Sequence, residues 1–111
     1  MNKKLISASI DQTLLKQDIT SSHLNRFCLD AQQYSFHSVC VNPYLVKEVS
    51  NSLKNSSVKI CSVAGFPLGI NTSKTKLAEI DTCLNDGASE IDMVMNIGLL
   101  KDGNLKAVNN E

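Results

Sequence analysis

The stretch Val58-Lys-Ile-Cys-Ser-Val-Ala64 is a nearly continuous apolar run, and Gly65-Phe-Pro-Leu-Gly69 follows it directly. A short apolar run rich in β-branched residues predicts a buried strand. Two glycines around a proline predict a tight loop after that strand. Thr72 or Ser73 then caps a helix, which Gly87 ends. The predicted apolar stripe of this helix consists of Leu77, Ile80 and Leu84.

The same alternation of strand and helix continues in both directions along the chain. We predict further strands over 7–13, 36–41 and 90–96, a helix over 21–34, and the start of a fourth helix over 99–111. Pro43 opens another helix, which ends at 55–57 and has an apolar stripe of Val46, Val49 and Leu53. Strands that alternate with helices predict an α/β fold with a parallel sheet and right-handed crossovers. Nearly continuous apolar strands are typical of a sheet covered on both faces by helices or by a barrel interior.

Length and charge limit the possible functions. The chain has 111 residues, which predicts a single domain over 1–111, and its 11 basic and 11 acidic side chains give a formal net charge of zero. We therefore expect no nucleic-acid partner and no membrane partner. Lys3 and Lys4 stand where the basic region of a signal peptide would lie, but only Leu5 and Ile6 follow as apolar residues. The expectation is a cytoplasmic protein.

The cysteines do not have the spacing of a metal site or of a disulfide framework. They stand far apart at Cys28, Cys40, Cys61 and Cys83, with no C-x-x-C pair, and His23 and His37 do not complete a ligand set. We expect reduced, mostly buried cysteines and no metal.

Four polar side chains stand at or within the predicted strands. Asp92 lies inside an apolar strand, where a carboxylate is costly unless it is paired or hydrogen-bonded. Asp11, with Thr13 beside it, ends the first predicted strand, and Cys40 ends the second. Since the carboxyl ends of parallel strands converge on one site, Asp11, Cys40 and Asp92 are expected to meet in one pocket.

Structural explanations remain open for each of these residues. Asp11 and Thr13 are also typical turn residues, and Cys40 is also typical of a core. Asp92 could be held by backbone amides or by a lysine such as Lys59, although Lys59 could equally alternate outward to solvent. The Gly65–Gly69 loop could cradle a phosphate, but it lacks a Walker lysine pattern and also fits a simple tight turn.

Four segments together resemble the first half of deoxyribose-phosphate aldolase. They are Ile10-Asp-Gln-Thr-Leu-Leu-Lys16, Ser38-Val-Cys-Val-Asn-Pro43, the stretch over 58–69, and Gly87-Ala-Ser-Glu-Ile-Asp-Met-Val-Met-Asn-Ile-Gly98. They stand in the order and at the spacing of that family and cover essentially the whole chain. Gln12 stands where many members have histidine.

The resemblance implies a (β/α)8 barrel of the TIM type and a class I aldolase of deoxyribonucleotide catabolism. That enzyme cleaves 2-deoxy-D-ribose 5-phosphate reversibly to glyceraldehyde 3-phosphate and acetaldehyde through a lysine Schiff base, without a metal or cofactor. Asp92 matches the carboxylate of the proton relay, while Asp11 and Thr13 match residues that line the sugar-phosphate site. Cys40 matches a cysteine beside that site.

The resemblance also implies that parts of the site are missing from this chain. The Schiff-base lysine and its partner lysine belong to the sixth and seventh strands, and the phosphate loops come later still, whereas this chain predicts only four strands. Neither Lys16 nor Lys59 matches a catalytic lysine, so we expect the isolated chain to be inactive.

A (β/α)4 half of a barrel has two open sheet edges, which proteins normally cover. We therefore expect association with a second copy, as a homo-oligomer, or with a C-terminal half. Two other interpretations remain: a non-catalytic, truncated, self-associating β/α module, and a complete small sheet of the flavodoxin type.

Overall fold

The protein is described by a computed structural model that covers residues 2–111. Its centre is one parallel sheet of four strands in the order β1-β2-β3-β4. The strands are β1 (Asp11–Leu14), β2 (Ser38–Val41), β3 (Lys59–Ala64) and β4 (Glu90–Met93). Each strand pairs with the next one in sequence, and the prediction of a parallel α/β sheet is confirmed. This order excludes the flavodoxin-type interpretation, because that fold places its first strand between the second and the third.

Helices connect the strands and flank the sheet at both ends of the chain. They are α1 (Lys3–Ser7), α2 (Ser21–Tyr34), the 3-10 helix η1 (Pro43–Leu45), α3 (Val46–Leu53), α4 (Ser73–Asp86), α5 (Ile97–Lys101) and α6 (Leu105–Asn110). The helix predicted over 21–34 is confirmed, with Thr20 accepting a hydrogen bond from the backbone of His23 as its N-cap. Thr72 caps α4 in the same way, and Gly87 ends that helix with a φ of 116°.

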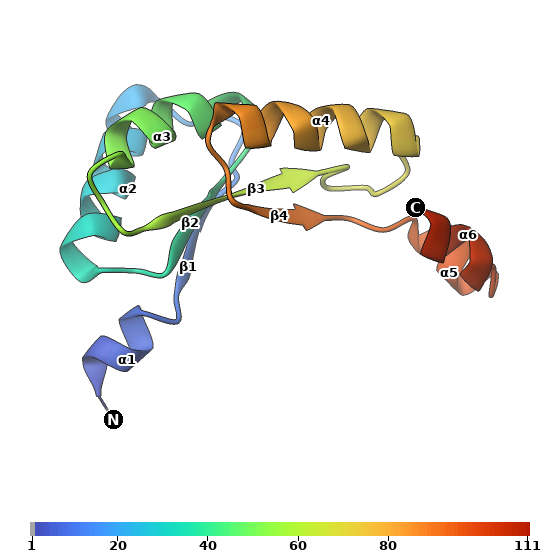
Figure 1. Ribbon diagram of the computed structural model, residues 1–111, viewed down its shortest axis with the longest axis horizontal. Coiled ribbons are helices and arrows are strands. Elements are labelled where there is room, and N and C mark those ends of the chain that lie inside the picture. The colour runs from blue at the N-terminus through green and yellow to red at the C-terminus, as the bar shows by residue number, and fades with distance from the viewer. Residues whose placement is uncertain (1) are drawn as a thin grey trace.

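Helices α2, α3 and α4 form one layer on one face of the sheet (Figure 1). Side chains from β2 and β3 pack against this layer and make the main core. The predicted inner positions of α3 are confirmed, because Val46, Val49 and Leu53 are all buried. No helix among residues 2–111 covers the opposite face of the sheet, which we call the open face.

Two predicted boundaries are wrong. The first strand begins at Asp11 and not at residue 7, because the short helix α1 occupies Lys3–Ser7 and a turn follows it. Asp11 therefore starts its strand and does not end it. The carboxy-terminal segment is two short helices and not one continuous helix, because Gly103 between them adopts a positive φ of 72°.

The predicted buried stripe of α4 is also wrong. Leu77 and Leu84 are 57% and 47% exposed, and the residues of α4 that are buried against the sheet are Lys76 and Cys83. The apolar stripe lies on the flank of α4, which is the last helix of the layer, so no further helix packs on it. Helical periodicity correctly indicated an amphipathic helix, but it did not specify which neighbour would cover the apolar side.

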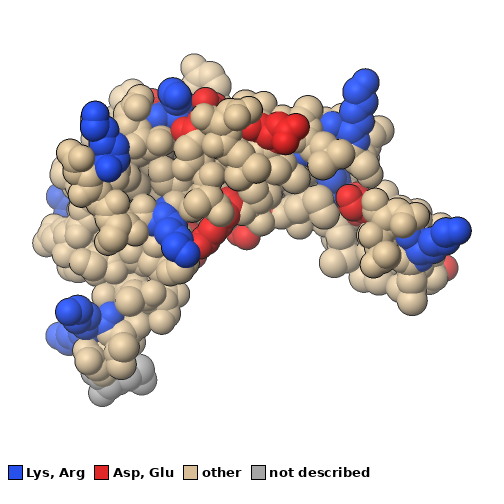
Figure 2. All heavy atoms as spheres, viewed as in Figure 1, with Lys and Arg blue, Asp and Glu red and all other residues tan. Residues whose placement is uncertain are grey.

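The molecule has the outline of an arch, hollowed on the side away from the helix layer (Figure 2). Basic and acidic side chains are interspersed on the visible face, as expected for a chain whose charges balance. Within residues 2–111, no helix combines the length and apolar character that crossing a bilayer requires.

Candidate functional site

Four side chains of the open face, one from each strand, come together. The ligand-type atoms of Asp11, Cys40, Cys61 and Asp92 all lie within 4.8 Å of one another. We call these four residues the thiol–carboxylate cluster. The prediction that Asp11, Cys40 and Asp92 come close together is thereby confirmed. Its reason is wrong for Asp11, which starts β1 and does not stand at the carboxyl end of the strand.

The register of the sheet explains this meeting. Cys40 and Cys61 are direct partners across β2 and β3, so their side chains point to the same face. The register partner of Cys40 on β1 is Thr13, and Asp11 lies two residues before it, so Asp11 points to the same face. Asp92 pairs with Val63, which lies two residues after Cys61, so Asp92 points to this face as well. The four residues thus form a row that crosses the strands obliquely, as in barrels, where strands tilt against the axis.

Cys61 belongs to the cluster but was not among the predicted site residues. The signal was present in the sequence, since Cys61 lies in the middle of the apolar stretch over 58–64. The face to which Cys61 points could have been inferred only from its pairing with Cys40, because the sequence of one strand does not show its register with the neighbouring strand.

Asp11 is held in place by a neighbouring strand. The hydroxyl of Ser38, its register partner on β2, donates a 2.6 Å hydrogen bond to Oδ1 of Asp11. Thr13 lies on the same face as Cys40, its register partner, and its hydroxyl donates to the backbone carbonyl of Asp11 at 3.1 Å. The structure therefore places Thr13 next to the cluster with a local hydrogen bond of its own.

Asp92 does not have the compensating partner that a carboxylate inside an apolar strand would need. Asp92 is exposed, because its face of β4 has no helix over it, and no ion pair reaches it within residues 2–111. Lys59, considered as its partner, is 54% exposed and instead lies 3.3 Å from Oε1 of Glu90. The same Glu90 oxygen lies 3.0 Å from Nε2 of His37. Hydrogen bonds from His37 and then from Lys59 hold the pKa of Glu90 below its ordinary value.

The two thiols of the cluster are protonated at neutral pH. Burial, with the negative charges of Asp11 and Asp92 nearby, raises the pKa of Cys40 to about 11. Burial and the neighbouring Cys40 raise the pKa of Cys61 further. All four cysteines are free and buried, which confirms that part of the cysteine prediction.

Lys76 is a second functional candidate that the sequence pattern did not indicate. Its residue is only 1% exposed, yet its ammonium group donates to the carbonyls of Gly69 at 2.8 Å and Val94 at 2.7 Å and pairs with the carboxylate of Glu111. The backbone N–H of Asn96 donates to the other oxygen of Glu111 at 2.9 Å. Hydrogen bonds to the charged form, above all from Lys76, lower the pKa of Glu111. Lys76 thus ties together the loops that follow β3 and β4.

The Gly65–Gly69 loop is a tight turn. Gly69 N–H donates to the Gly65 carbonyl at 2.7 Å, and Gly65 N–H donates to the carboxylate of Glu79 at 2.8 Å. These two amides already have partners, which favours the structural interpretation of the loop over a phosphate cradle. Gly69 has a φ of 73°, and a Cβ there would lie 2.1 Å from the carbonyl oxygen of Met95.

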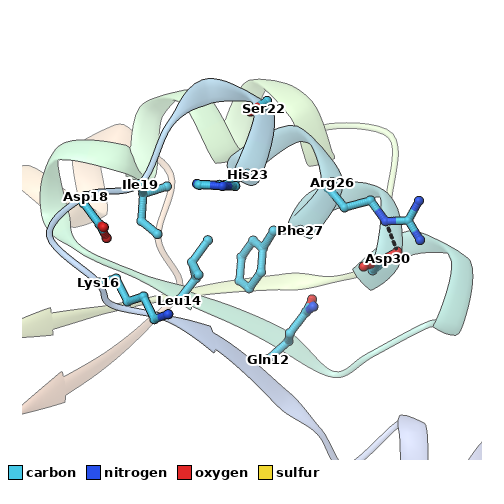
Figure 3. Close-up of a pocket in the computed structure, with 10 residues that line it drawn as sticks. All are labelled: Gln12, Leu14, Lys16, Asp18, Ile19, Ser22, His23, Arg26, Phe27 and Asp30. Atoms are coloured by element: carbon cyan, nitrogen blue, oxygen red, sulfur yellow. Dashed lines mark ion pairs between the residues drawn. The ribbon is translucent and has the colours of Figure 1, made fainter.

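A cavity of about 390 Å³ lies on the other side of the sheet, between β1 and α2 (Figure 3). We call it the edge pocket; its lining residues are Gln12, Leu14, Lys16, Asp18, Ile19, Ser22, His23, Arg26, Phe27 and Asp30. Leu14, Ile19 and Phe27 form its apolar part, and an Arg26–Asp30 ion pair of 2.9 Å lies at one end. None of the residues of the thiol–carboxylate cluster lines it. The edge pocket marks an uncovered flank of the α/β layer.

Comparison with known proteins finds relatives of similar sequence and fold. No family model matches the chain. The whole chain is 50% identical over 111 residues to a protein named deoxyribose-phosphate aldolase from Caldicellulosiruptor saccharolyticus, and it covers 50% of that protein. It is also 50% identical over 99 residues to the deoxyribose-phosphate aldolase of a Geobacillus species, with 89% of this chain and 44% of that protein covered.

The fold agrees with the sequence match. The tetrameric deoxyribose phosphate aldolase from Aeropyrum pernix superimposes with a TM-score of 0.84 at 33% identity, over 88% of this chain and 42% of that one. The chain therefore spans about half the length of the relatives that it matches.

Proposed function

We propose that the chain is a (β/α)4 half-barrel of the deoxyribose-phosphate aldolase family and that it carries the carboxylate part of an aldolase site whose nucleophile lies on a partner. The similarity over essentially the whole chain supports this proposal. The reaction is the reversible cleavage of 2-deoxy-D-ribose 5-phosphate to glyceraldehyde 3-phosphate and acetaldehyde. The observation that carries the proposal is the convergence of Asp11, Cys40 and Asp92 on the open face.

In this proposal, Asp92 moves the proton. Retro-aldol cleavage requires a base to take the hydroxyl proton as the carbon–carbon bond breaks, and a positioned carboxylate does this work directly or through a lysine. Asp92 suits the role because it is exposed on the open face and has no ion-pair partner within residues 2–111. Asp11 and Thr13 line the sugar side of the site, and Cys40 forms part of its floor.

The Schiff-base lysine comes from outside residues 2–111 in this proposal. Lys59 is engaged with Glu90, and Lys76 is engaged with Glu111 and two backbone carbonyls. A Schiff-base lysine requires a free amine in a desolvated pocket, and neither of these two lysines meets that condition.

The partner docks on both flanks of the half-barrel. Strands β1 and β4 each have one unpaired edge, the edge pocket opens beside α2, and the apolar stripe of α4 is uncovered. Unpaired edges and uncovered apolar surface favour association. A second copy could cover these surfaces, but only a half with further β/α units supplies the lysine, so we propose that half as the catalytic partner.

The experiment that tests the proposed function is complementation. The chain is co-expressed with the remaining half of the Caldicellulosiruptor relative, and acetaldehyde release from 2-deoxyribose 5-phosphate is measured. We expect activity only in the mixture, and Asp92→Asn should reduce it by about 100-fold or more, since general acid–base catalysis contributes about that much.

Asp81→Asn, a change of an exposed aspartate on the outer side of α4, is the matched control and should leave the activity unchanged. A folded, co-purifying but inactive complex would overturn the aldolase proposal and favour the interpretation as a non-catalytic self-associating module.

A further inference from the structure

We propose that Lys76 is a positioning residue of the aldolase site, because it fixes the end of β4 and thereby the direction of the Asp92 carboxylate. The inference rests on the proposed function, in which Asp92 moves the proton during carbon–carbon cleavage. It deepens that proposal by assigning part of the catalytic rate to a buried side chain of α4 that takes no part in the reaction itself.

The orientation of Asp92 depends on the backbone of β4. Its side chain is exposed on the open face, and no ion pair reaches it within residues 2–111. Asp11, by contrast, accepts a 2.6 Å hydrogen bond from the hydroxyl of Ser38. β4 is the last strand of the sheet, so only β3 pairs with it. Since a catalytic side chain must be held within about 0.5 Å of its productive geometry, the segment after Asp92 has to be fixed by contacts from another element.

Lys76 supplies these contacts from the helix layer. Its ammonium group donates at 2.7 Å to the carbonyl of Val94, which lies two residues after Asp92. The same group donates at 2.8 Å to the carbonyl of Gly69 in the loop after β3. The backbone N–H of Val94 donates to the carbonyl of Ala64 at 3.0 Å, so both polar backbone groups of Val94 are bonded. The backbone directly beyond Asp92 is therefore held by β3 and by Lys76 together.

Glu111 completes the arrangement around the ammonium group. Its side chain is buried and pairs with Lys76, while its other carboxylate oxygen accepts a 2.9 Å hydrogen bond from the backbone N–H of Asn96. The segment 94–96 is therefore held at its first residue by Lys76 and at its last by Glu111. Because apolar side chains of similar volume often stabilise a core as well as a buried ion pair does, the geometry that this pair imposes explains it better than stability alone.

Close packing around Lys76 leaves little freedom to the segments that it joins. Lys76 is 1% exposed, and a Cβ at Gly65 would lie 2.7 Å from its Cε atom. A Cβ at Gly69 would lie 2.8 Å from Cγ1 of Val94. Without the ammonium group, the contacts to Gly69, Val94 and Glu111 are lost together. A displacement of about 1 Å at a catalytic group can lower the rate by about 100-fold, so we expect the effect on the chemical step and not on substrate binding.

The test compares kcat and KM of complemented mixtures that carry Lys76→Met or Val49→Ala. Val49 is buried in the core on α3 and does not belong to the thiol–carboxylate cluster, so Val49→Ala controls for lost stability. Assays are run at a temperature at which circular dichroism shows both variants folded, and rates are given per mole of complex. Lys76→Met should lower kcat by about 10-fold or more and change KM by about 2-fold or less. Val49→Ala should leave both constants unchanged.

Glu111→Gln is a smaller change in the same arrangement and serves if Lys76→Met does not fold; its kcat should fall while its KM stays constant. Hydrogen exchange of the isolated chain adds a readout without substrate. The amides of 92–96 should exchange faster in either variant, whereas those of α2 should keep their protection. An unchanged kcat, a fall no larger than that of Val49→Ala, or unchanged exchange over 92–96 would overturn the proposal. An inactive parent mixture would instead overturn the proposed function, and hydrogen exchange would still decide whether Lys76 fixes the end of β4.

Discussion

The ammonium group of Lys76 donates a 2.7 Å hydrogen bond to the carbonyl of Val94, just beyond the strand that carries Asp92. The same nitrogen donates to Gly69 in the loop after β3. The buried side chain of Lys76 on α4 therefore holds together the segments that follow the adjacent strands β3 and β4. Lys76 is a structural support for the candidate site and not one of its reacting groups.

Replacing Lys76 by methionine should destabilise the chain. The variant leaves the carbonyls of Gly69 and Val94 without their donor and Glu111 without its cation, and unsatisfied buried groups cost about 1–3 kcal/mol each. Urea unfolding should show a clearly lower midpoint. Lys74→Met, on the exposed side of the same helix, is the control and should stay within about 0.5 kcal/mol of the parent chain. Equal midpoints for the two variants would show that the Lys76 contacts contribute nothing.

Two glycines, Gly69 and Gly103, allow the cost of a left-handed backbone to be measured separately from the cost of a steric clash. Gly69 and Gly103 have φ values of 73° and 72°, but a Cβ at Gly69 would lie 2.1 Å from the Met95 carbonyl oxygen, whereas no atom lies within 4 Å of one at Gly103. Both alanine variants should lose about 1 kcal/mol from the left-handed backbone. Gly69→Ala should lose at least that much again in unfolding free energy. An equal loss for both would mean that the loop after β3 does not approach the end of β4 as described.

The apolar stripe of α4 should matter for association and not for folding of the half-barrel. Leu84 is 47% exposed, so Leu84→Glu should change the unfolding free energy by about 0.5 kcal/mol or less. It should nevertheless reduce co-purification with the complementing half, because a charge would enter an apolar interface. Asn85→Glu adds the same charge at a neighbouring exposed position and serves as the control. A large loss of stability in Leu84→Glu would mean that the stripe packs within the half-barrel itself.

Stability should fall as the pH rises above about 9. Burial raises the pKa of Cys28 and of Cys83 above the ordinary thiol value of 9.0. At alkaline pH the unfolded chain loses these thiol protons first, while the folded chain still binds them, so folding stability decreases as the pH rises. Below pH 9 both states hold the protons and the contribution is constant.

Unfolding midpoints of the parent chain and of Cys28→Ala/Cys83→Ala, measured from pH 8 to 10.5, test this expectation. The double variant should show the shallower decline. Identical slopes would show that other groups control alkaline unfolding. The comparison uses slopes, because alanine in the core also lowers the stability by leaving a small cavity.

Secondary structure could be predicted from the sequence where local signals, such as a helix cap and apolar periodicity, agreed with the tertiary packing. The helix Ser21–Tyr34 combines an N-cap at Thr20 with inward apolar residues at helical spacing, and both features could be predicted from the chain alone. The meeting of Asp11 with Cys40 and Asp92 was also predicted, but from the convergence of the carboxyl ends of the strands. The structure brings them together because they share one face of the sheet, although Asp11 starts its strand.

Other features depend on contacts that one segment cannot reveal. Lys76 lies inward because its alkyl chain packs under Gly65 while its ammonium finds acceptors in three distant segments. Leu77 lies outward because α4 is the last helix of the layer and no other helix among residues 2–111 packs on its flank. The site membership of Cys61 depends on register with Cys40.

We propose that this half-barrel supplies the carboxylate of the aldolase site while its partner supplies the nucleophile. Borohydride reduction of the complemented mixture in the presence of acetaldehyde, followed by peptide mass spectrometry, tests that division directly. We expect a reduced imine on a lysine of the partner half and none on this chain, including Lys59 and Lys76. A stoichiometric adduct on any lysine of this chain would contradict it.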